Sequence, residues 1–208
     1  MTNIGGRNTS GILERLAEEF ASVIPKIDSQ AEHSRWKPGI GPFEEERQLE
    51  RLVEATAQGS IGQYLQSEQP YPHRSRQCDL IVNTDTTQIP VEAKLLRFRY
   101  DNGSIDPNSY ARIFTPFPER TSSSLLTDAA KLHESAFDPS GGLLGLYYEK
   151  QDETYRQMDV EKLAEKFSID VRFWYDFEVE TVKIARFDGL RHPHHQRGAI
   201  IAWEIMMR

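Results

Sequence analysis

The sequence predicts an α/β domain in which a mixed β-sheet is flanked by helices, with an N-terminal helical extension. Segments whose apolar residues repeat at helical spacing enclose segments with strand-like patterns, as in α/β proteins. One strand, 143–148, is apolar almost throughout, which is typical of a central strand covered on both faces. A chain of 208 residues with 38% hydrophobic residues is also long enough for one sizeable core.

The N-terminal part is expected to be helical. Residues 10–24 place apolar side chains at helical spacing, with Ser10 as the N-cap and Pro25 at the end of the helix. Polar residues 26–42 predict a loop, and a second helix is expected over about 43–57. We therefore expect the extension to cover residues 1–42 and the main domain to cover 43–208.

The rest of the chain alternates strands and helices. Residues 60–76 are ambiguous and are expected to hold at most one short strand. Two strands, 77–83 and 88–98, follow closely and are joined by polar residues 84–87, which predicts a β-hairpin. After a long proline-containing loop we expect a helix at 122–136, the central strand, a helix at about 159–167, a strand at 171–177 and a last strand at 199–206.

Charge and composition limit the classes of function. A net charge of −7 argues against a protein that coats nucleic acid generally, although residues 71–100 carry five Lys or Arg against three Asp or Glu. The single cysteine, Cys78, permits no intrachain disulfide and fits a reducing cytoplasm. The sequence has no apolar run of about 18 residues and no signal-peptide pattern. We therefore expect a soluble, cytoplasmic protein without a membrane partner.

The predicted hairpin separates polar from apolar residues. If the turn is centred between Asp85 and Thr86, residues whose numbers sum to 171 face each other across the pair. Leu80 then meets Val91, Val82 meets Ile89 and Cys78 meets Ala93, which makes one face wholly apolar. On the other face Asp79 meets Glu92, with Lys94 two residues further along.

This polar face has the groups that phosphodiester hydrolysis needs. Two facing carboxylates repel each other unless a hard cation such as Mg²⁺ neutralises them. A lysine beside them can orient an attacking water and help to deprotonate it. The opposing interpretation of Asp79, Glu92 and Lys94 is an exposed strand face with mixed surface charges.

The sequence Cys78-Asp79, followed after twelve residues by Glu92-Ala93-Lys94, resembles the motif of the PD-(D/E)xK, or restriction-endonuclease-like, nuclease superfamily. The resemblance covers about residues 43–149 and implies an α-β-β-β-α-β core. It further implies that Asp79, Glu92 and the Ala93 carbonyl bind Mg²⁺, with Mn²⁺ able to substitute. Lys94 would position the attacking water. Segments 112–117, 126–132 and 190–198, the last of which precedes 202–205, are also similar to an uncharacterised bacterial family within this superfamily. Pro90 departs from a regular strand because it cannot donate to a sheet ladder.

Further residues are candidates for the same site. Many superfamily members add an acidic residue from the first core helix, and Glu45, followed by Glu46, lies nearest the apolar stripe of the second helix. Glutamates at a helix start also simply favour the helix dipole. Arg74, Arg76, Lys131, Arg191 and Arg197 are candidate phosphate contacts, although Lys131 is expected more often to pair with Asp128, three residues earlier.

The cluster of His192, His194 and His195 suggests zinc. Structural zinc sites use four convergent Cys or His ligands, and the chain has one Cys, so phosphate binding by the neighbouring arginines or loop packing is favoured over zinc.

The leading hypothesis is a Mg²⁺-dependent DNA endonuclease in restriction, phage defence or repair. Cutting both strands with such a small protein would favour a homodimer, since one site cuts one strand. Two alternatives remain open. The first is an inactive nucleic-acid-binding or assembly module with the same fold, and the second is a metal-dependent hydrolase of a small phosphorylated substrate.

Overall fold

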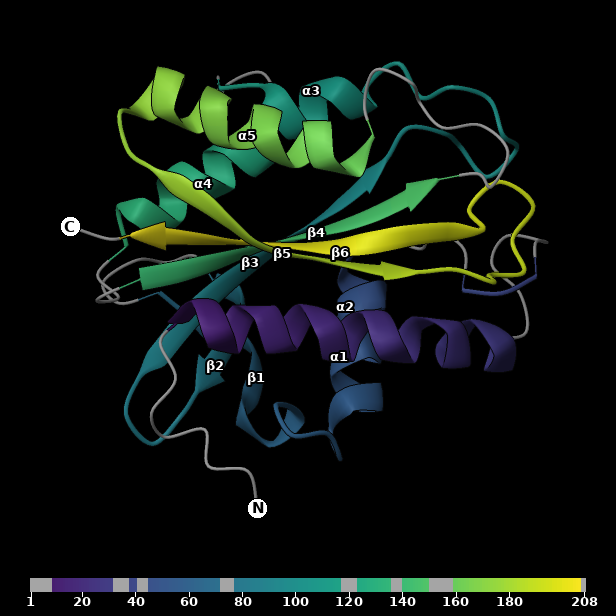
Figure 1. The fold of residues 1–208 in the computed structure, drawn as a ribbon, viewed down its shortest axis with the longest axis horizontal. Coiled ribbons are helices and arrows are strands. Elements are labelled where there is room, and N and C mark those ends of the chain that lie inside the picture. The colour runs from purple at the N-terminus through teal and green to yellow at the C-terminus, as the bar shows by residue number, and fades with distance from the viewer. Residues whose placement is uncertain are drawn as a thin grey trace.

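A six-stranded mixed sheet lies between two layers of helices in the computed structural model (Figure 1). The structure describes residues 9–31, 38–40, 45–71, 77–116, 123–135, 140–149 and 159–206, without the side chains of residues 45 and 46. The strands are β1 (Leu65–Pro70), β2 (Gln77–Asn83), β3 (Gln88–Arg97), β4 (Ser140–Glu149), β5 (Val179–Phe187) and β6 (Arg197–Met206). Their order is β1-β2-β3-β4-β6-β5, and only β3 and β4 are parallel neighbours. The expected α/β class is confirmed.

The helices divide between the two faces of the sheet. One face carries α1 (Thr9–Gln30) and α2 (Glu45–Thr56), and the other carries α3 (Ser109–Phe114), α4 (Leu125–His133) and α5 (Val160–Tyr175) (Figure 1). A short 3₁₀ helix, η1 (Gly62–Tyr64), precedes β1. The parallel pair β3 and β4 is joined through α3 and α4, because parallel neighbours require a long crossover. Along the chain, α2 is followed by η1, β1, β2, β3, α3, α4 and β4, so the expected α-β-β-β-α-β order is present with η1 and α3 as additional short helices.

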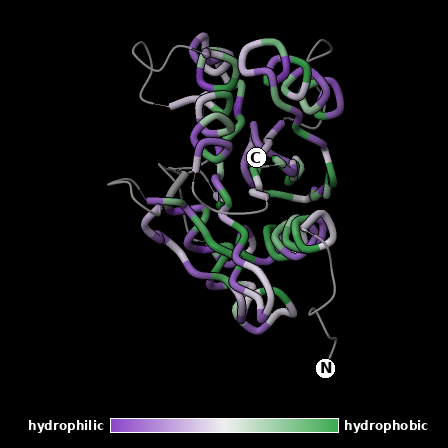
Figure 2. Tube along the Cα trace, turned by 90° about the vertical axis from the view of Figure 1, so that its left-hand side faces the viewer, coloured by the Kyte–Doolittle hydropathy of each residue, from purple (hydrophilic) through white to green (hydrophobic). Residues whose placement is uncertain are grey.

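Each face of the sheet has its own hydrophobic core. The α1-side core includes Leu16, Phe20, Leu52, Leu80, Val91 and Ala93. The α4-side core includes Tyr71, Cys78, Ile81, Leu96, Ala129 and Trp203. A view turned by 90° shows the N-terminal helix end-on, with green, hydrophobic positions on the side that faces the strands (Figure 2). None of the described helices is long and apolar enough to cross a membrane.

Helix α1 is longer than expected and packs on the sheet. It continues through Pro25 to Gln30, although proline removes one helical hydrogen bond. Phe20 and Ile24 are fully buried, and Asp28, 1% exposed, accepts the amide of Ile40 at 2.8 Å. Burial of residues on both sides of Pro25 therefore maintains the helix. The domain boundary expected between residues 42 and 43 lies outside the described residues.

The prediction for residues 159–177 is wrong in one respect. The expected helix and strand are a single helix, α5, and the next strand is β5. Val160, Leu163, Ala164, Phe167 and Val171 form the buried stripe of this helix. The aromatic residues Phe173 and Trp174, which lie within the expected strand, are exposed on α5 at 75% and 45%. Helical spacing of the buried residues outweighs the strand preference of the aromatic ones.

Pro90 lies opposite Ile81 in the β2–β3 pair, at a position where the backbone is directed away from β2. The amide of Ala93 points toward β2, where it donates to Asp79, so alternation along the strand directs position 90 toward β4. The described β3–β4 pairing begins one residue later, at Val91 and Gly142. A residue without an N–H group therefore removes no bond from that described ladder.

Candidate phosphodiesterase site

The candidate site lies where the β2–β3 ladder ends. The hairpin has the predicted register, with Leu80 opposite Val91 and Val82 opposite Ile89. The described pairing stops at Leu80 and Val91, and beyond it the amide of Ala93 donates to Asp79 Oδ2 at 2.8 Å. The half-buried Asp79 side chain therefore lies at the point where the two strands separate.

Cys78 lies on the other face from the one predicted for it. It was expected opposite Ala93 on the apolar face, but it belongs to the α4-side core, together with Tyr71. The cause is a local distortion. The β2–β3 register ends two residues away, and Glu68, between the β1 partners of Leu80 and Cys78, has φ of 49°. Burial raises the pKa of the Cys78 thiol to about 12, and the charge of Glu92 adds to the effect.

Glu92 is a buried carboxyl held by α4 and by Tyr71. It is 3% exposed, Lys131 Nζ lies 2.7 Å from its Oε1, and the Tyr71 hydroxyl donates to the same oxygen. Burial, and after it the charge of Asp79, raise the pKa of Glu92 to about 8, against the opposing charge of Lys131. Without a metal ion, this carboxyl group therefore holds its proton over much of the neutral range.

Lys94 is anchored by Asp128 on α4 and by Ser123, which precedes this helix. Its Nζ lies 3.1 Å from Asp128 Oδ2 and donates to Ser123 Oγ at 2.7 Å. Asp128 is 5% exposed, and burial raises its pKa while Lys94 lowers it. This ion pair joins the lysine to a carboxylate on α4, a third one besides the two carboxylates of the hairpin.

Helix α4 therefore contributes two functional candidates, of which only Lys131 was predicted. The helix begins after Ser124, whose side chain accepts the Thr127 amide at 3.1 Å as an N-cap. Asp128 and Lys131 follow one turn apart on the same face. The expected pairing of Lys131 with Asp128 is present at 3.8 Å, but the contact with Glu92 is shorter. The signal that could have identified Asp128 in the sequence was its position beside the buried stripe of the helix that follows the hairpin.

The acidic candidates on α2 are not placed. The side chains of Glu45 and Glu46 lie outside the described residues. The helix packs on the α1 side of the sheet through Leu49 and Leu52, whereas Asp128 approaches from the opposite side. The described part of α2 has two buried polar residues, Gln48 and Thr56, and Gln48 accepts the Tyr148 hydroxyl at 2.6 Å.

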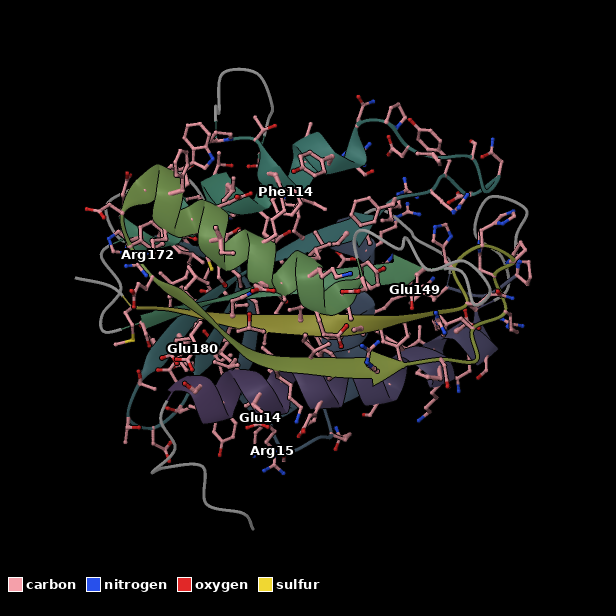
Figure 3. All side chains as sticks on the ribbon, turned by 45° about the horizontal axis from the view of Figure 1, so that its top comes forward. Glu14, Arg15, Phe114, Glu149, Arg172 and Glu180 are labelled. Atoms are coloured by element: carbon pink, nitrogen blue, oxygen red, sulfur yellow. The ribbon has the colours of Figure 1, made fainter. Side chains whose placement is uncertain are left out.

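The structure does not bring the arginine candidates that it describes to this site. Arg191 Nε lies 3.4 Å from Asp28 Oδ2 at the end of α1. Arg197 Nε lies 2.7 Å from Oε1 of Glu149, which is at the end of β4 (Figure 3). Lys94 lies opposite Gly145 on β4, four residues before Glu149. The salt bridge between Arg197 and Glu149 is therefore roughly 13 Å from Lys94 along the strand. Arg74 and Arg76 lie outside the described residues.

The hairpin carboxylates have donor atoms left for a metal ion. Asp79 Oδ2 and Glu92 Oε1 have hydrogen-bond donors, whereas Asp79 Oδ1 and Glu92 Oε2 have none among the described residues. The Ala93 carbonyl points to the same side as its amide, toward Asp79. An all-oxygen set of this kind suits Mg²⁺ or Mn²⁺.

Comparisons of the chain with protein-family models, curated proteins and solved structures returned no match.

Proposed function

We propose that this chain is a Mg²⁺-dependent phosphodiesterase that cuts DNA as an endonuclease. The observation that supports it best is the convergence of Asp79, Glu92 and Lys94 at the end of the β2–β3 ladder, with Asp128 and Lys131 closing the cluster from α4. The opposing interpretation, an exposed strand with surface charges, does not fit residues as buried as Glu92 and Lys94, which are 3% and 9% exposed. Buried charges of this kind are costly and concentrate at functional sites.

The metal would be held by Asp79, Glu92 and the carbonyl of Ala93. Bound there, Mg²⁺ would supply positive charge to the pentacovalent transition state of phosphodiester hydrolysis. Mn²⁺ has the same preference for oxygen ligands and is expected to replace it.

The chain's own residues position the reaction. Water attacks the phosphorus, the P–O3′ bond breaks, and the products carry a 5′-phosphate and a 3′-hydroxyl. Lys94 Nζ, fixed by Asp128 and Ser123, orients the attacking water. Asp128 acts as a positioning residue through Lys94, and Lys131 balances the charge of Glu92.

The choice of DNA as the substrate has two supports. The motif of Asp79, Glu92, Ala93 and Lys94 resembles that of the PD-(D/E)xK nucleases, and residues 71–100 have an excess of basic residues. A single site cuts one strand, so double-strand cleavage would require two copies of the chain. We therefore expect nicked circles as the first product from a monomer and linear DNA only from a homodimer.

The test is a plasmid-nicking assay with Mg²⁺, Mn²⁺ or EDTA, run on wild type, on Lys94→Ala and on the matched control Lys162→Ala. Lys162 forms an exposed ion pair on α5. Nicking by wild type and the control, lost in EDTA and reduced by about 10²–10⁴-fold in Lys94→Ala, supports the proposal. Unchanged cleavage by Lys94→Ala would refute it. Hydrolysis of a small phosphodiester without nicking would favour a small-substrate hydrolase, and DNA binding without turnover would favour an inactive module.

A further inference from the structure

A second polar cluster lies where the segment after β3 meets the β5–β6 loop. It consists of Asp101, His192 and His195. In the described part of the chain, these residues form the one group of three or more His, Cys, Asp or Glu side chains with ligand atoms within 4.8 Å of one another. Both histidines are 1% exposed, and the Asp101 side chain is 16% exposed. We propose that this cluster binds a first-row transition-metal dication, with Zn²⁺ as the representative ion.

The contacts of His195 leave its Nδ1 atom for a ligand. Its Nε2 lies 3.2 Å from the carbonyl oxygen of Arg99, which can only accept a hydrogen bond. A neutral His195 therefore carries its proton on Nε2 and a lone pair on Nδ1. Metal-bound histidines commonly donate their other ring N–H to a backbone carbonyl in this way.

The two imidazole rings approach each other as ligands of one ion would. His195 Nδ1 lies 3.1 Å from His192 Nδ1, and the His194 amide donates to His192 Nδ1 at 3.1 Å. With these partners both Nδ1 atoms present lone pairs, which repel at this distance unless a cation lies between them. Two nitrogens at about 2.0–2.1 Å from tetrahedral Zn²⁺ are roughly 3.3 Å apart, close to the observed separation. Binding would require His192 Nδ1 to exchange the His194 amide for the ion.

Asp101 supplies the negative charge. Its Oδ1 accepts Arg97 Nη1 at 3.2 Å, and its Oδ2 is buried with no hydrogen-bond partner among the described residues. The Arg97 charge weakens the attraction of this carboxylate for a hard cation, so the affinity depends mainly on the imidazoles. Imidazole nitrogen favours zinc and its neighbours over Mg²⁺, which distinguishes this cluster from the oxygen-rich hairpin site.

Zinc was not expected from the sequence because the chain has a single Cys to join the histidines near His192. Asp101 is far from the histidines in the sequence and joins them only because the two loops meet in the fold. A metal here would link the segment that follows β3, the strand of Glu92 and Lys94, to the β5–β6 loop. Its binding does not depend on the proposed nuclease activity.

The test measures metal bound by the full chain without a polyhistidine tag. After dialysis against a chelator, Zn²⁺ is titrated with a competing chelator, and bound metal is measured by mass spectrometry. We expect about one tight equivalent per chain and a rise in melting temperature of roughly 5–10 °C at a hundredfold excess over Kd. His195→Ala and Asp101→Asn should each weaken binding at least about tenfold.

Matched variants separate this cluster from other ligands. His133→Ala removes a histidine on α4 that stacks on Phe177 and should retain tight zinc. Glu92→Gln and Cys78→Ser should also retain it, because they alter only the hairpin site. Co²⁺ bound to wild type should give visible absorption bands that Asp101→Asn changes, which serves as a readout even if His195→Ala does not fold. Absence of tight binding by wild type, or loss of zinc in Glu92→Gln with retention in Asp101→Asn, would overturn the proposal.

Discussion

Replacing Glu92 with glutamine should remove a pH-dependent loss of stability from the metal-free protein. The pKa of Glu92 is raised from its ordinary value of 4.5 to about 8, so the folded state binds more protons than the unfolded state between these values. Stability therefore falls as pH rises through this window, and the loss is complete only above the folded pKa. Glutamine resembles the protonated carboxyl group in size and does not ionise.

The size of the effect follows from the two pKa values. As pH rises from about 6.5 to about 9, the folded protein loses stability until Glu92 ionises in the folded state, near pH 8. The loss of stability therefore extends over roughly 1.5 pH units. At about 1.4 kcal/mol per unit, wild type should lose about 2 kcal/mol more than Glu92→Gln over this range. For a chain of this length that is a difference of roughly 4–8 °C in melting temperature.

The assay is urea unfolding, in EDTA, at several pH values for wild type, Glu92→Gln and the control Glu50→Gln. Glu50 is exposed on α2, so its variant should follow wild type. Parallel decline of wild type and Glu92→Gln would show that this carboxyl does not titrate there, and the account of the buried cluster would then be incorrect.

Three further results are expected. Lys131→Met should move the pH at which Mg²⁺ first supports nicking upward, because Lys131 lowers the pKa of Glu92; an unchanged pH–rate profile would contradict this. Cys78 should react with an aromatic disulfide reagent only on unfolding, since its thiol is buried and its pKa is raised to about 12; rapid labelling of the native protein would contradict this. Phe20→Ala should cost about 3–5 kcal/mol in urea unfolding because this α1 side chain is fully buried, whereas Phe173→Ala, at a site 75% exposed, should cost little. Equal losses would argue against the packing of α1 on the sheet.

The hairpin was the most predictable part of the molecule, for a local reason. A short polar turn sets which residues face each other, and a one-residue shift would bring Leu80 and Val91 out of the core. Sequence pattern alone therefore determined this register. The pattern could not reveal where the ladder ends, because that depends on Asp79 accepting the Ala93 amide and on the distortion at Glu68.

The partners of the hairpin residues could not be predicted from local pattern. Lys94 pairs with Asp128, and Glu92 pairs with Lys131, only because α4 docks against β3 with that helix face inward. The same limit applies to Asp101, which meets the histidines through the contact of two loops distant in sequence. Helical period gave the buried stripe of α4, but it does not specify which strand the stripe covers.

The charges of the hairpin site show how one cluster can hold a metal and then a phosphodiester. With Glu92 ionised, Asp79, Glu92 and Asp128 face Lys94 and Lys131, which leaves one uncompensated negative charge in a poorly solvated place. Protonation of Glu92 removes that charge in the metal-free state, which agrees with its raised pKa. A divalent cation with Glu92 ionised changes the balance to one positive charge, which matches the single negative charge of a phosphodiester. Metal binding therefore releases a proton, and the two lysines reduce the negative charge that would otherwise repel the substrate.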